Sequence, residues 1–409
     1  MTRILQSVVL LIAICVAAPA QVVPAATGGA PIGNKLNYVL YYSQMTEMAG
    51  SLGDWQTAAA SASVSYANGK DRSPFSMTYS GGYTWTLAGP SYLTGFFQHL
   101  LLSQGIVWHK WNFTVNDDAS YFPEAPMIGF SGIPGIGEPV GVPAPPITPS
   151  NQSILTLNTH VVQNDVSGAT AYHFSHATAL SAGGSFDLLR YPDDNGLNMN
   201  TVMGNVTLTR RLDARNSLTG NYVFSQFSYP DYNFTFTTNS VSPGFEHVWS
   251  RAVTTNISAG PQWTSSSSSA TVPPSTGVTV NASVNYKVKL NSASLIYTRG
   301  VMGGAGYLIG GESDDLSATF SHVFDRNLTI GFDGSFMRLS GLQNNGVIYS
   351  KYGGIQATRR MGRHFSAFAN YTAVVQSSSS ALPANTLSQL MQIVGFGISY
   401  SPRKTSLGH

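Results

Sequence analysis

The residues that could carry chemistry are scattered along this chain and form no reactive set. Among nine histidines, the closest pair, His173 and His176, straddles a predicted turn and lacks the closely spaced partners of a metal site. Serine is abundant, but no Gly-x-Ser-x-Gly sequence marks a nucleophile. Gly303, Gly304 and Gly306 follow a predicted strand but precede no helix, which argues against phosphate binding. The sequence therefore predicts no enzyme, no metal and no cofactor.

A few charged residues on predicted strands are the remaining candidates for a functional role. Charged residues make up only 10% of the chain, against roughly 25% in soluble domains. The formal net charge of +2 implies neither nucleic acid nor an acidic surface as a partner. If the strands surround a pore, the residues that would line it and tune ion selectivity, or serve only as solvated lumen groups, are Asp187, Lys287, Lys289 and Asp333.

The elements that would position these residues are antiparallel strands, and the clearest example is the hairpin at residues 205–227. In its second arm Leu218, Tyr222 and Phe224 alternate with polar residues. This period of two indicates a strand with one apolar face. Between the arms, Asp213 lies in a polar break that predicts a tight turn. The polar face is small and hydroxyl-rich, so we expect the apolar face to contact lipid and the polar face to line a lumen.

The hairpin recurs along the second half of the chain. Its two strands are joined by a short reversal and followed by a longer connection. A parallel β-helix, the main soluble alternative, would lack these regular reversals. The short reversals, spaced by 36 to 39 residues, are predicted at Ser175, Asp213, Ser250, Lys289, Asp325 and Gly362. The longer connections are predicted at 191–196, 229–232, 264–275, 303–315, 343–346 and 377–385.

Six further strands are predicted outside the repeats. The early ones cover 35–44, 57–67, 75–87, 92–103 and 106–115, with a turn at Gln104 and Gly105, and the last covers 392–401. Since no segment beyond the N-terminus approaches the roughly 20 apolar residues of a spanning helix, a membrane could be crossed only by strands closed into a barrel. The predicted fold is all-β, a transmembrane antiparallel up-and-down β-barrel of 16 to 18 strands, with 18 favoured.

The chain divides into this barrel and three flanking segments. Residues 1–20 are predicted to be a cleavable secretory signal peptide, with Arg3 before an apolar core that contains the only cysteine, Cys15. Residues 21–34 would form a flexible periplasmic leader, residues 35–402 the barrel, and residues 403–409 a C-terminal tail. Within the barrel, residues 121–153 hold eight prolines and are predicted to be a long loop, because proline cannot donate to a sheet ladder.

With its signal peptide, repeated hairpins and terminal aromatic strand, the chain resembles large bacterial outer-membrane β-barrels of the porin type. The resemblance covers nearly all of the mature chain and is carried by pattern rather than by a diagnostic motif. It implies a location in the outer membrane, contact with the lipid bilayer and lipopolysaccharide, and recognition by the insertion machinery. The aromatic signal read by that machinery would be internal here, because nine residues follow Tyr400. Many porins are trimers, but the sequence leaves the oligomeric state open.

The resemblance also implies a role for residues 121–153. Porins fold one long loop into the lumen, where it narrows the pore, and this segment is the candidate for such a constriction or plug. It is less acidic than the usual constriction loop, since it holds only two glutamates. The candidate residues are Glu124, Phe130, Ile133, Gly135, Gly137 and Glu138.

Five tryptophans lie near predicted strand ends, where they would form an aromatic girdle at the membrane interfaces or, alternatively, stack against sugars in a pore. They are Trp85, Trp108, Trp111, Trp249 and Trp263.

The function favoured by the sequence is a channel for passive diffusion of small hydrophilic solutes. Two alternatives from other classes stay open. The barrel could be plugged and serve as a surface-structural or adhesive protein, which the aromatic and Ser-rich loops would suit. It could also conduct an exported polysaccharide, which the lumen hydroxyls and tryptophans would suit. An outer-membrane hydrolase is disfavoured by the missing nucleophile motif.

Overall fold

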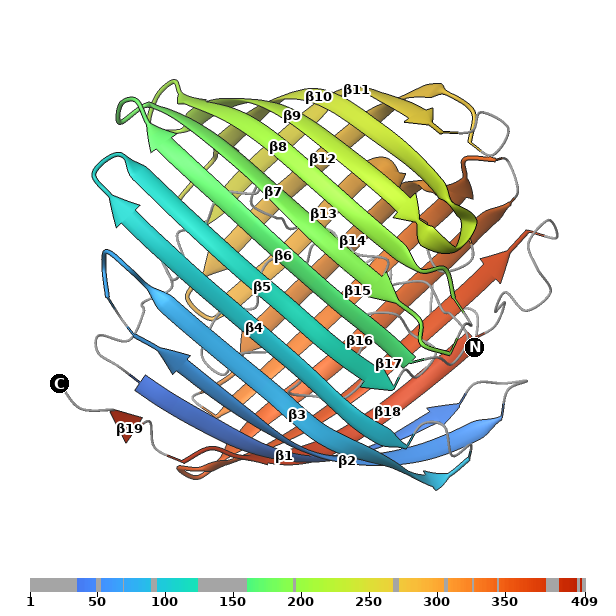
Figure 1. The fold of residues 1–409 in the computed structure, drawn as a ribbon. Helices are drawn as coiled ribbons and strands as arrows, with labels where there is room; N and C mark the ends of the chain where they lie inside the picture. The colour runs from blue at the N-terminus through green and yellow to red at the C-terminus, as the bar shows by residue number, and fades with distance from the viewer. Residues whose placement is uncertain are drawn as a thin grey trace.

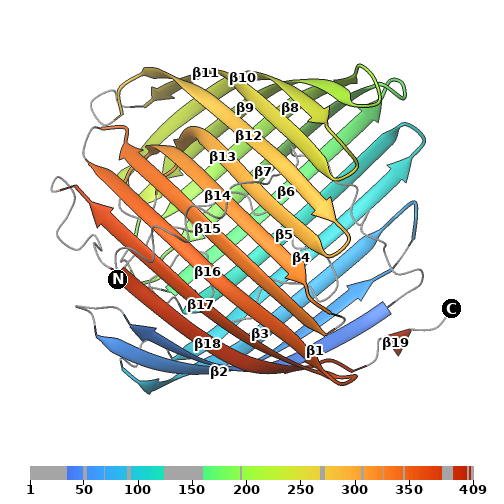
Figure 2. The same ribbon diagram turned by 180° about the vertical axis from the view of Figure 1, so that it is seen from behind.

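The strands form one closed antiparallel barrel in a computed structural model of the protein (Figures 1 and 2). The structure describes residues 35–48, 53–68, 70–89, 94–123, 160–193, 196–267, 272–304, 308–325, 327–343, 346–379, 390–402 and 405–406. No helix long and apolar enough to span a membrane occurs in these ranges. The predicted signal peptide, the leader and residues 124–153 lie outside them.

The described residues confirm the predicted eighteen strands, each paired with its neighbours along the chain. The barrel is closed by β1 and β18, whose register runs from Leu40 opposite Tyr400 to Met48 opposite Gln392. A two-residue strand, β19 (Thr405–Ser406), also pairs with β1. The wall consists of β1 (Lys35–Met48), β2 (Asp54–Ala67), β3 (Phe75–Ala88), β4 (Gly95–Trp108), β5 (Trp111–Pro123), β6 (His160–His173), β7 (Thr178–Arg190), β8 (Met199–Arg211), β9 (Asn216–Tyr229), β10 (Phe234–Val248), β11 (Val253–Ser266), β12 (Ser275–Val288), β13 (Asn291–Met302), β14 (Gly311–Val323), β15 (Leu328–Gly341), β16 (Val347–Met361), β17 (Phe365–Ser378) and β18 (Leu390–Tyr400).

The two ends of the barrel differ in their connections. At the short-turn end, the predicted reversals at Ser175, Asp213, Ser250, Lys289, Asp325 and Gly362 all lie in connections of two to four residues. The connections between β2 and β3 and between β4 and β5 lie at the same end, and the remaining connections lie at the opposite end, called here the long-loop end. One of them contains a short 3-10 helix, Pro230–Tyr232, which is followed by Asn233 in a left-handed conformation. This asymmetry matches the predicted arrangement.

Several predicted boundaries were wrong, among them those of β4, β5 and β14. Gln104 and Gly105 do not form a turn, because β4 continues to Trp108 and the chain reverses at His109, whose φ is 48°. The amide of Gln104 instead donates to Ser73 Oγ at 3.1 Å and to the Pro74 carbonyl at 3.2 Å, so its donors are satisfied by the connection between β2 and β3. β5 runs to Pro123, beyond the predicted start of the long loop at residue 121.

The third error concerns the start of β14. Residues 311–315 were predicted to be part of a connection, but they are strand. Their acidic residues hide the alternation because Glu312 and Asp314 occupy outward positions that are usually apolar. The Arg299 guanidinium lies 2.7 Å from Glu312 and 3.2 Å from Asp314, and Arg338 lies 3.2 Å from Asp314. Ion pairing on the outer face therefore replaces the expected apolar pattern.

Cross-strand register assigns every strand residue to one of two faces, because directly opposed residues point the same way. Leu218 and Tyr222 face outward, with 45% and 43% of their surface exposed, as predicted for the lipid side. The inward neighbours are small and polar. Thr207 Oγ1, for example, donates to Asn221 Oδ1 at 2.8 Å across β8 and β9. The wall is thus apolar outside and hydroxyl-rich inside.

A carboxylate organises the short turn between β8 and β9. Asp213 accepts hydrogen bonds from the Asn216 amide at 2.6 Å and from the backbone N–H groups of Arg215 and Asn216 at 2.7 and 3.0 Å. These donors, with the Asn216 amide contributing most, hold the pKa of Asp213 below its ordinary value of 3.8. The ionised carboxylate therefore stabilises the turn fully at pH values above 3.8. This stabilisation is lost as the pH falls through the lowered pKa of Asp213.

An arginine introduced on the outward face of β9 should affect barrel assembly more than one introduced on the inward face. We expect Tyr222→Arg to impair barrel assembly, because an arginine near the middle of the lipid face costs roughly 2–4 kcal/mol. Asn221→Arg, at the adjacent inward position, should assemble normally. The mobility difference between unheated and heated samples on a gel measures folding, and equal folding of both variants would contradict the facing.

The Asp213 turn gives a second prediction. Asn216→Ala should raise the pKa of Asp213 toward 3.8, because the variant loses the strongest donor to that carboxylate. Titration of the Asp213 carboxyl carbon by NMR measures this. Asn221→Ala, on the same strand but remote from the turn, is the control and should leave the pKa unchanged. An unaltered pKa in Asn216→Ala would refute the assignment.

Candidate functional site: the barrel lumen

The lumen is lined mainly by serine, threonine, asparagine and glycine. Several of the hydroxyls are bonded across the wall, as in the contact of 3.0 Å from Ser80 Oγ to Ser63 Oγ. Ser350, Thr372 and Gln376, on β16 and β17, are almost completely buried on the inward side. The side chains of this part of the wall are thus neutral hydrogen-bond donors and acceptors.

Three inward carboxylates lie side by side on β5, β6 and β7. Asp118 is directly opposite Asp165, and Asp165 is directly opposite Asp187. We call these three residues the aspartate row. His99 Nε2 lies 2.7 Å from Asp118 Oδ1 at one side, and Gln163 Nε2 donates to Asp187 Oδ1 at 3.3 Å at the other. The row concentrates negative charge in the middle third of the wall.

The opposite wall, formed by β14 and β15 (Figures 1 and 2), adds Asp315 and Asp333 at inward positions. The inward lysine and arginine side chains that the structure describes are Arg211, Lys287 and Arg360, all within two residues of the short-turn end. Away from that end, the charges on the described lumen wall are therefore carboxylates, with His99 as the only basic side chain among them.

The predicted pore residues are not all in the lumen. Asp187 and Asp333 face inward at mid-depth, and Lys287 faces inward close to the short-turn end. Lys289 lies in the turn between β12 and β13, with a φ of 25°, and so does not line the wall. The constriction-loop candidates, Glu124, Phe130, Ile133, Gly135, Gly137 and Glu138, lie outside the described residues.

All five predicted girdle tryptophans lie on the outward side. Trp85 and Trp263 are near the long-loop end, while Trp108, Trp111 and Trp249 are near the short-turn end, where Trp108 and Trp249 are each 63% exposed. None of the five is placed to stack against a sugar in the lumen. The remaining tryptophan, Trp55, faces inward opposite Glu47, and both are buried.

An apolar cluster narrows the lumen at the long-loop end and was not anticipated from the sequence. Phe227 stacks on Phe236 with ring centroids 4.9 Å apart, and Tyr229 stacks on Phe234 at 6.1 Å. All four point inward from β9 and β10. We call them, with the buried residues packed on them, the mouth cluster, which also includes Val161, Leu189, Tyr191, Met199 and Val272.

The connection between β13 and β14 folds inward onto this cluster. β13 pairs with β12 only as far as Arg299, and beyond it the N–H of Val301 donates to Gln262 Oε1 on β11 at 3.2 Å. The hydroxyl of Tyr229 donates to the Gly303 carbonyl and accepts from the N–H of Gly310 at 3.1 Å. Tyr229 thus fixes both ends of the connection from four strands away.

Glycine is required where this connection passes the cluster. A side chain at Gly303 would collide with Met199 and Phe227. Gly304 has a φ of 91°, and a Cβ there would overlap the Leu308 carbonyl. Gly303 and Gly304, for which the sequence argued against phosphate binding, therefore serve close packing. The signal in the sequence was the change of the inward positions of β9 from Thr219 and Asn221 to aromatic residues.

Within the described ranges, no group of three or more His, Cys, Asp or Glu side chains could hold a metal ion. The aspartate row accordingly provides electrostatic attraction and solvation, without the converging geometry of coordination. The candidate site is therefore a lumen wall that carries fixed charge.

A closed, eighteen-stranded, up-and-down barrel with an apolar exterior and a polar interior has the architecture of an outer-membrane β-barrel. Among solved structures, the chain is similar to Pseudomonas aeruginosa OccK2 (OpdF), with 11% identity, a TM-score of 0.51 and coverage of 91% of this chain and 98% of that one. It is also similar to Acinetobacter baumannii OccAB4, with 10% identity, a TM-score of 0.50 and coverage of 91% and 98%. No protein-family model and no curated protein matches the sequence. At these identities the likeness extends to the fold alone.

The Tyr229 hydroxyl should control the width of the mouth. Tyr229→Phe removes a donor to Gly303 and an acceptor for Gly310 and should destabilise the inward connection by about 1–3 kcal/mol. We expect noisier single-channel current and faster proteolysis between residues 303 and 310, with the barrel still folded. Tyr222→Phe removes an outward hydroxyl that donates to Asn239 and is the control. Identical currents and cleavage rates for both variants would refute this role of Tyr229.

Proposed function

We propose that this protein is an outer-membrane channel through which small hydrophilic solutes diffuse passively, and that its lumen favours cations over anions. The aspartate row is the observation that supports this charge preference. An eighteen-stranded barrel is wide enough to enclose water when nothing fills it. Transport would then need no cofactor and no reaction, only a sieve of fixed width with weak polar contacts.

The charge preference follows from where the fixed charges lie. Carboxylates at mid-depth lower the electrostatic energy of a cation in the narrow, low-dielectric passage and raise that of an anion. The inward Arg211, Lys287 and Arg360 lie near one exit, and beyond a distance of about 8–10 Å their charge is screened at physiological salt. They therefore offset the aspartate row only weakly.

Narrowing of the passage has two sources in this proposal. The mouth cluster and the connection between β13 and β14 occupy part of the long-loop end. Residues 121–153 would narrow the lumen further, as proposed from the sequence. This segment connects β5 and β6, two of the three strands that carry the aspartate row, so we expect a solute to pass both.

The outer face supports contact with lipopolysaccharide. Arg299, Glu312, Asp314 and Arg338 form an ion network near the long-loop end, and Tyr297 donates to Asp314 at 2.8 Å. We infer that this polar band lies at the depth of lipopolysaccharide headgroups, because an ion network is unfavourable among acyl chains. The insertion machinery would read β18, whose outward Val394, Phe396 and Ile398 precede Tyr400. The oligomeric state stays open.

Conductance measurements in planar bilayers test the proposal. We expect reversal potentials in a salt gradient to indicate cation selectivity. Asp118→Asn should lower the cation-to-anion permeability ratio by at most about fivefold, the equivalent of roughly 1 kcal/mol for a solvated charge. Asp117→Asn changes the neighbouring outward carboxylate and should leave the ratio unchanged. A folded barrel without conductance steps would refute the channel, and anion selectivity would refute the charge preference.

A further inference from the structure

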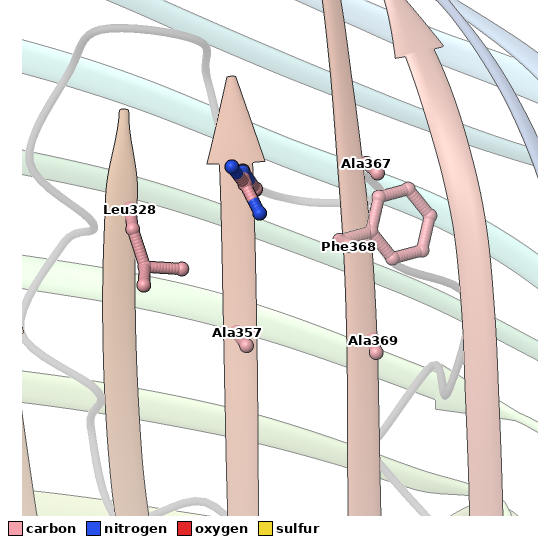
Figure 3. A pocket seen from close by; sticks show the side chains of 6 residues that line it. Leu328, Ala357, Ala367, Phe368 and Ala369 are labelled. Carbon is pink, nitrogen blue, oxygen red and sulfur yellow. The ribbon is translucent and has the colours of Figure 1, made fainter. Parts of the chain in front are cut away.

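The outward wall is hollowed between β15, β16 and β17, close to the short-turn end (Figure 3). The hollow measures about 260 Å³ and exists because three alanines occupy outward positions that elsewhere carry large apolar side chains. Leu328 forms one side, and Phe368 also contributes to the lining. Ala357 is directly opposite Ala369, and Arg359 is directly opposite Ala367. The lining consists of Leu328, Ala357, Arg359, Ala367, Phe368 and Ala369.

An apolar hollow on the lipid side needs an occupant that matches its shape. An empty hollow forfeits dispersion contacts with its lining. Its volume exceeds the roughly 150 Å³ of an apolar cavity that holds one benzene ring. A segment of acyl chain can therefore enter between the alanines without displacing protein.

Unneutralised positive charge lies beside the hollow. Arg359 is exposed at its edge, and Arg363 is exposed in the adjoining turn between β16 and β17. Neither belongs to any ion pair among the residues that the structure describes. This differs from the outer-face arginines Arg299 and Arg338, which already have carboxylate partners. The charge of Arg359 and Arg363 is left for an anion from outside the chain.

We propose that this hollow is a binding site for an anionic phospholipid of the leaflet at the short-turn end. One acyl chain lies over Ala357, Ala367 and Ala369, and the phosphate accepts hydrogen bonds from Arg359 and Arg363. The aliphatic stem of Arg359 packs along the apolar wall while its guanidinium reaches the headgroup level. The inference depends on the proposed placement in a membrane, but it is independent of conductance.

A second copy of the barrel fits this surface less well. A two-fold contact would place the same patch on both partners. The unpaired arginines of one copy would then face those of the other, and like charges repel. A phospholipid instead supplies both the acyl chain and the negative group. Lipopolysaccharide is excluded by position, because the hollow lies at the end opposite the long loops.

Native mass spectrometry of the detergent-purified, full-length barrel tests the site, with phosphatidylglycerol and phosphatidylcholine as probes. We expect phosphatidylglycerol to bind more tightly and to raise the thermal midpoint more. The double variant Arg359→Gln with Arg363→Gln should lose about tenfold or more in phosphatidylglycerol affinity, because charge-assisted hydrogen bonds to the phosphate are lost. Arg210→Gln, at an outward position near the same end of β8, is the matched control and should retain full affinity.

The acyl contact is tested separately. Ala369→Leu should fill the hollow and weaken phosphatidylglycerol binding, while Ala182→Leu, at an outward position on β7, should not. Glycerol phosphate, the headgroup without chains, should bind at least a hundredfold more weakly. Gel mobility of unheated samples confirms that each variant is folded.

Three outcomes would overturn the proposal. Equal phosphatidylglycerol affinity in wild type and the arginine double variant would remove the role of the charges. Glycerol phosphate binding as tightly as the lipid would identify a site for free anions. Dissociation of a purified dimer by Ala369→Leu would assign the surface to a second copy. Lipid binding in a barrel without conductance would leave the site intact while refuting the channel.

Discussion

The whole structure depends on one constraint, that each backbone N–H and C=O facing hydrocarbon must be bonded within the chain. The pairing of β18 with β1 meets this constraint by removing the last open edge. Once the sheet is closed, the period of two in every strand divides the side chains between lipid and lumen. Closure therefore fixes the fold and also decides which residues face the lumen.

The outward and inward faces of the barrel wall carry charges of different sign. Most arginines of the strands, such as Arg190, Arg299 and Arg338, are on the outward side, while most strand carboxylates away from the ends are on the inward side. These three outward arginines have polar partners: Arg190 donates to Asn200 at 2.6 Å, and Arg299 and Arg338 pair with Glu312 and Asp314. The near-neutral net charge of +2 hides this separation. Composition alone could not have revealed an acidic lumen.

Local sequence signals predicted the fold because each of them acts within a few residues. Asp213 and Asp325 form the expected turns by accepting hydrogen bonds from backbone N–H groups two and three residues ahead. The turn placed at Gln104 failed because tertiary partners in the preceding turn satisfy that amide. Polarity in a sequence does not distinguish a solvated turn from a strand position whose side chain has a hydrogen-bond partner elsewhere in the fold.

The arrangement of side chains in the lumen was less predictable, because it depends on the register between neighbouring strands. Asp187 was identified as a lumen residue, but its alignment with Asp165 and Asp118 depends on the register of β5, β6 and β7 relative to one another. A shift of one residue would send the middle carboxylate into lipid. The mouth cluster was missed for a related reason, since Tyr229 meets Gly303 and Gly310 only after four strands have curved around the barrel.

That link from Tyr229 also has a mechanical consequence. A ring of strands joined only to nearest neighbours resists stretching but can flatten into an ellipse at little cost, because each hinge between strands bends slightly. Tyr229 and the inward connection link β9 directly to the ends of β13 and β14, across part of the barrel's cross-section. They oppose flattening at the long-loop end, whereas the short-turn end has no comparable brace among its described residues. The cross-section at the mouth should therefore stay round and constant while the other end deforms with the surrounding bilayer.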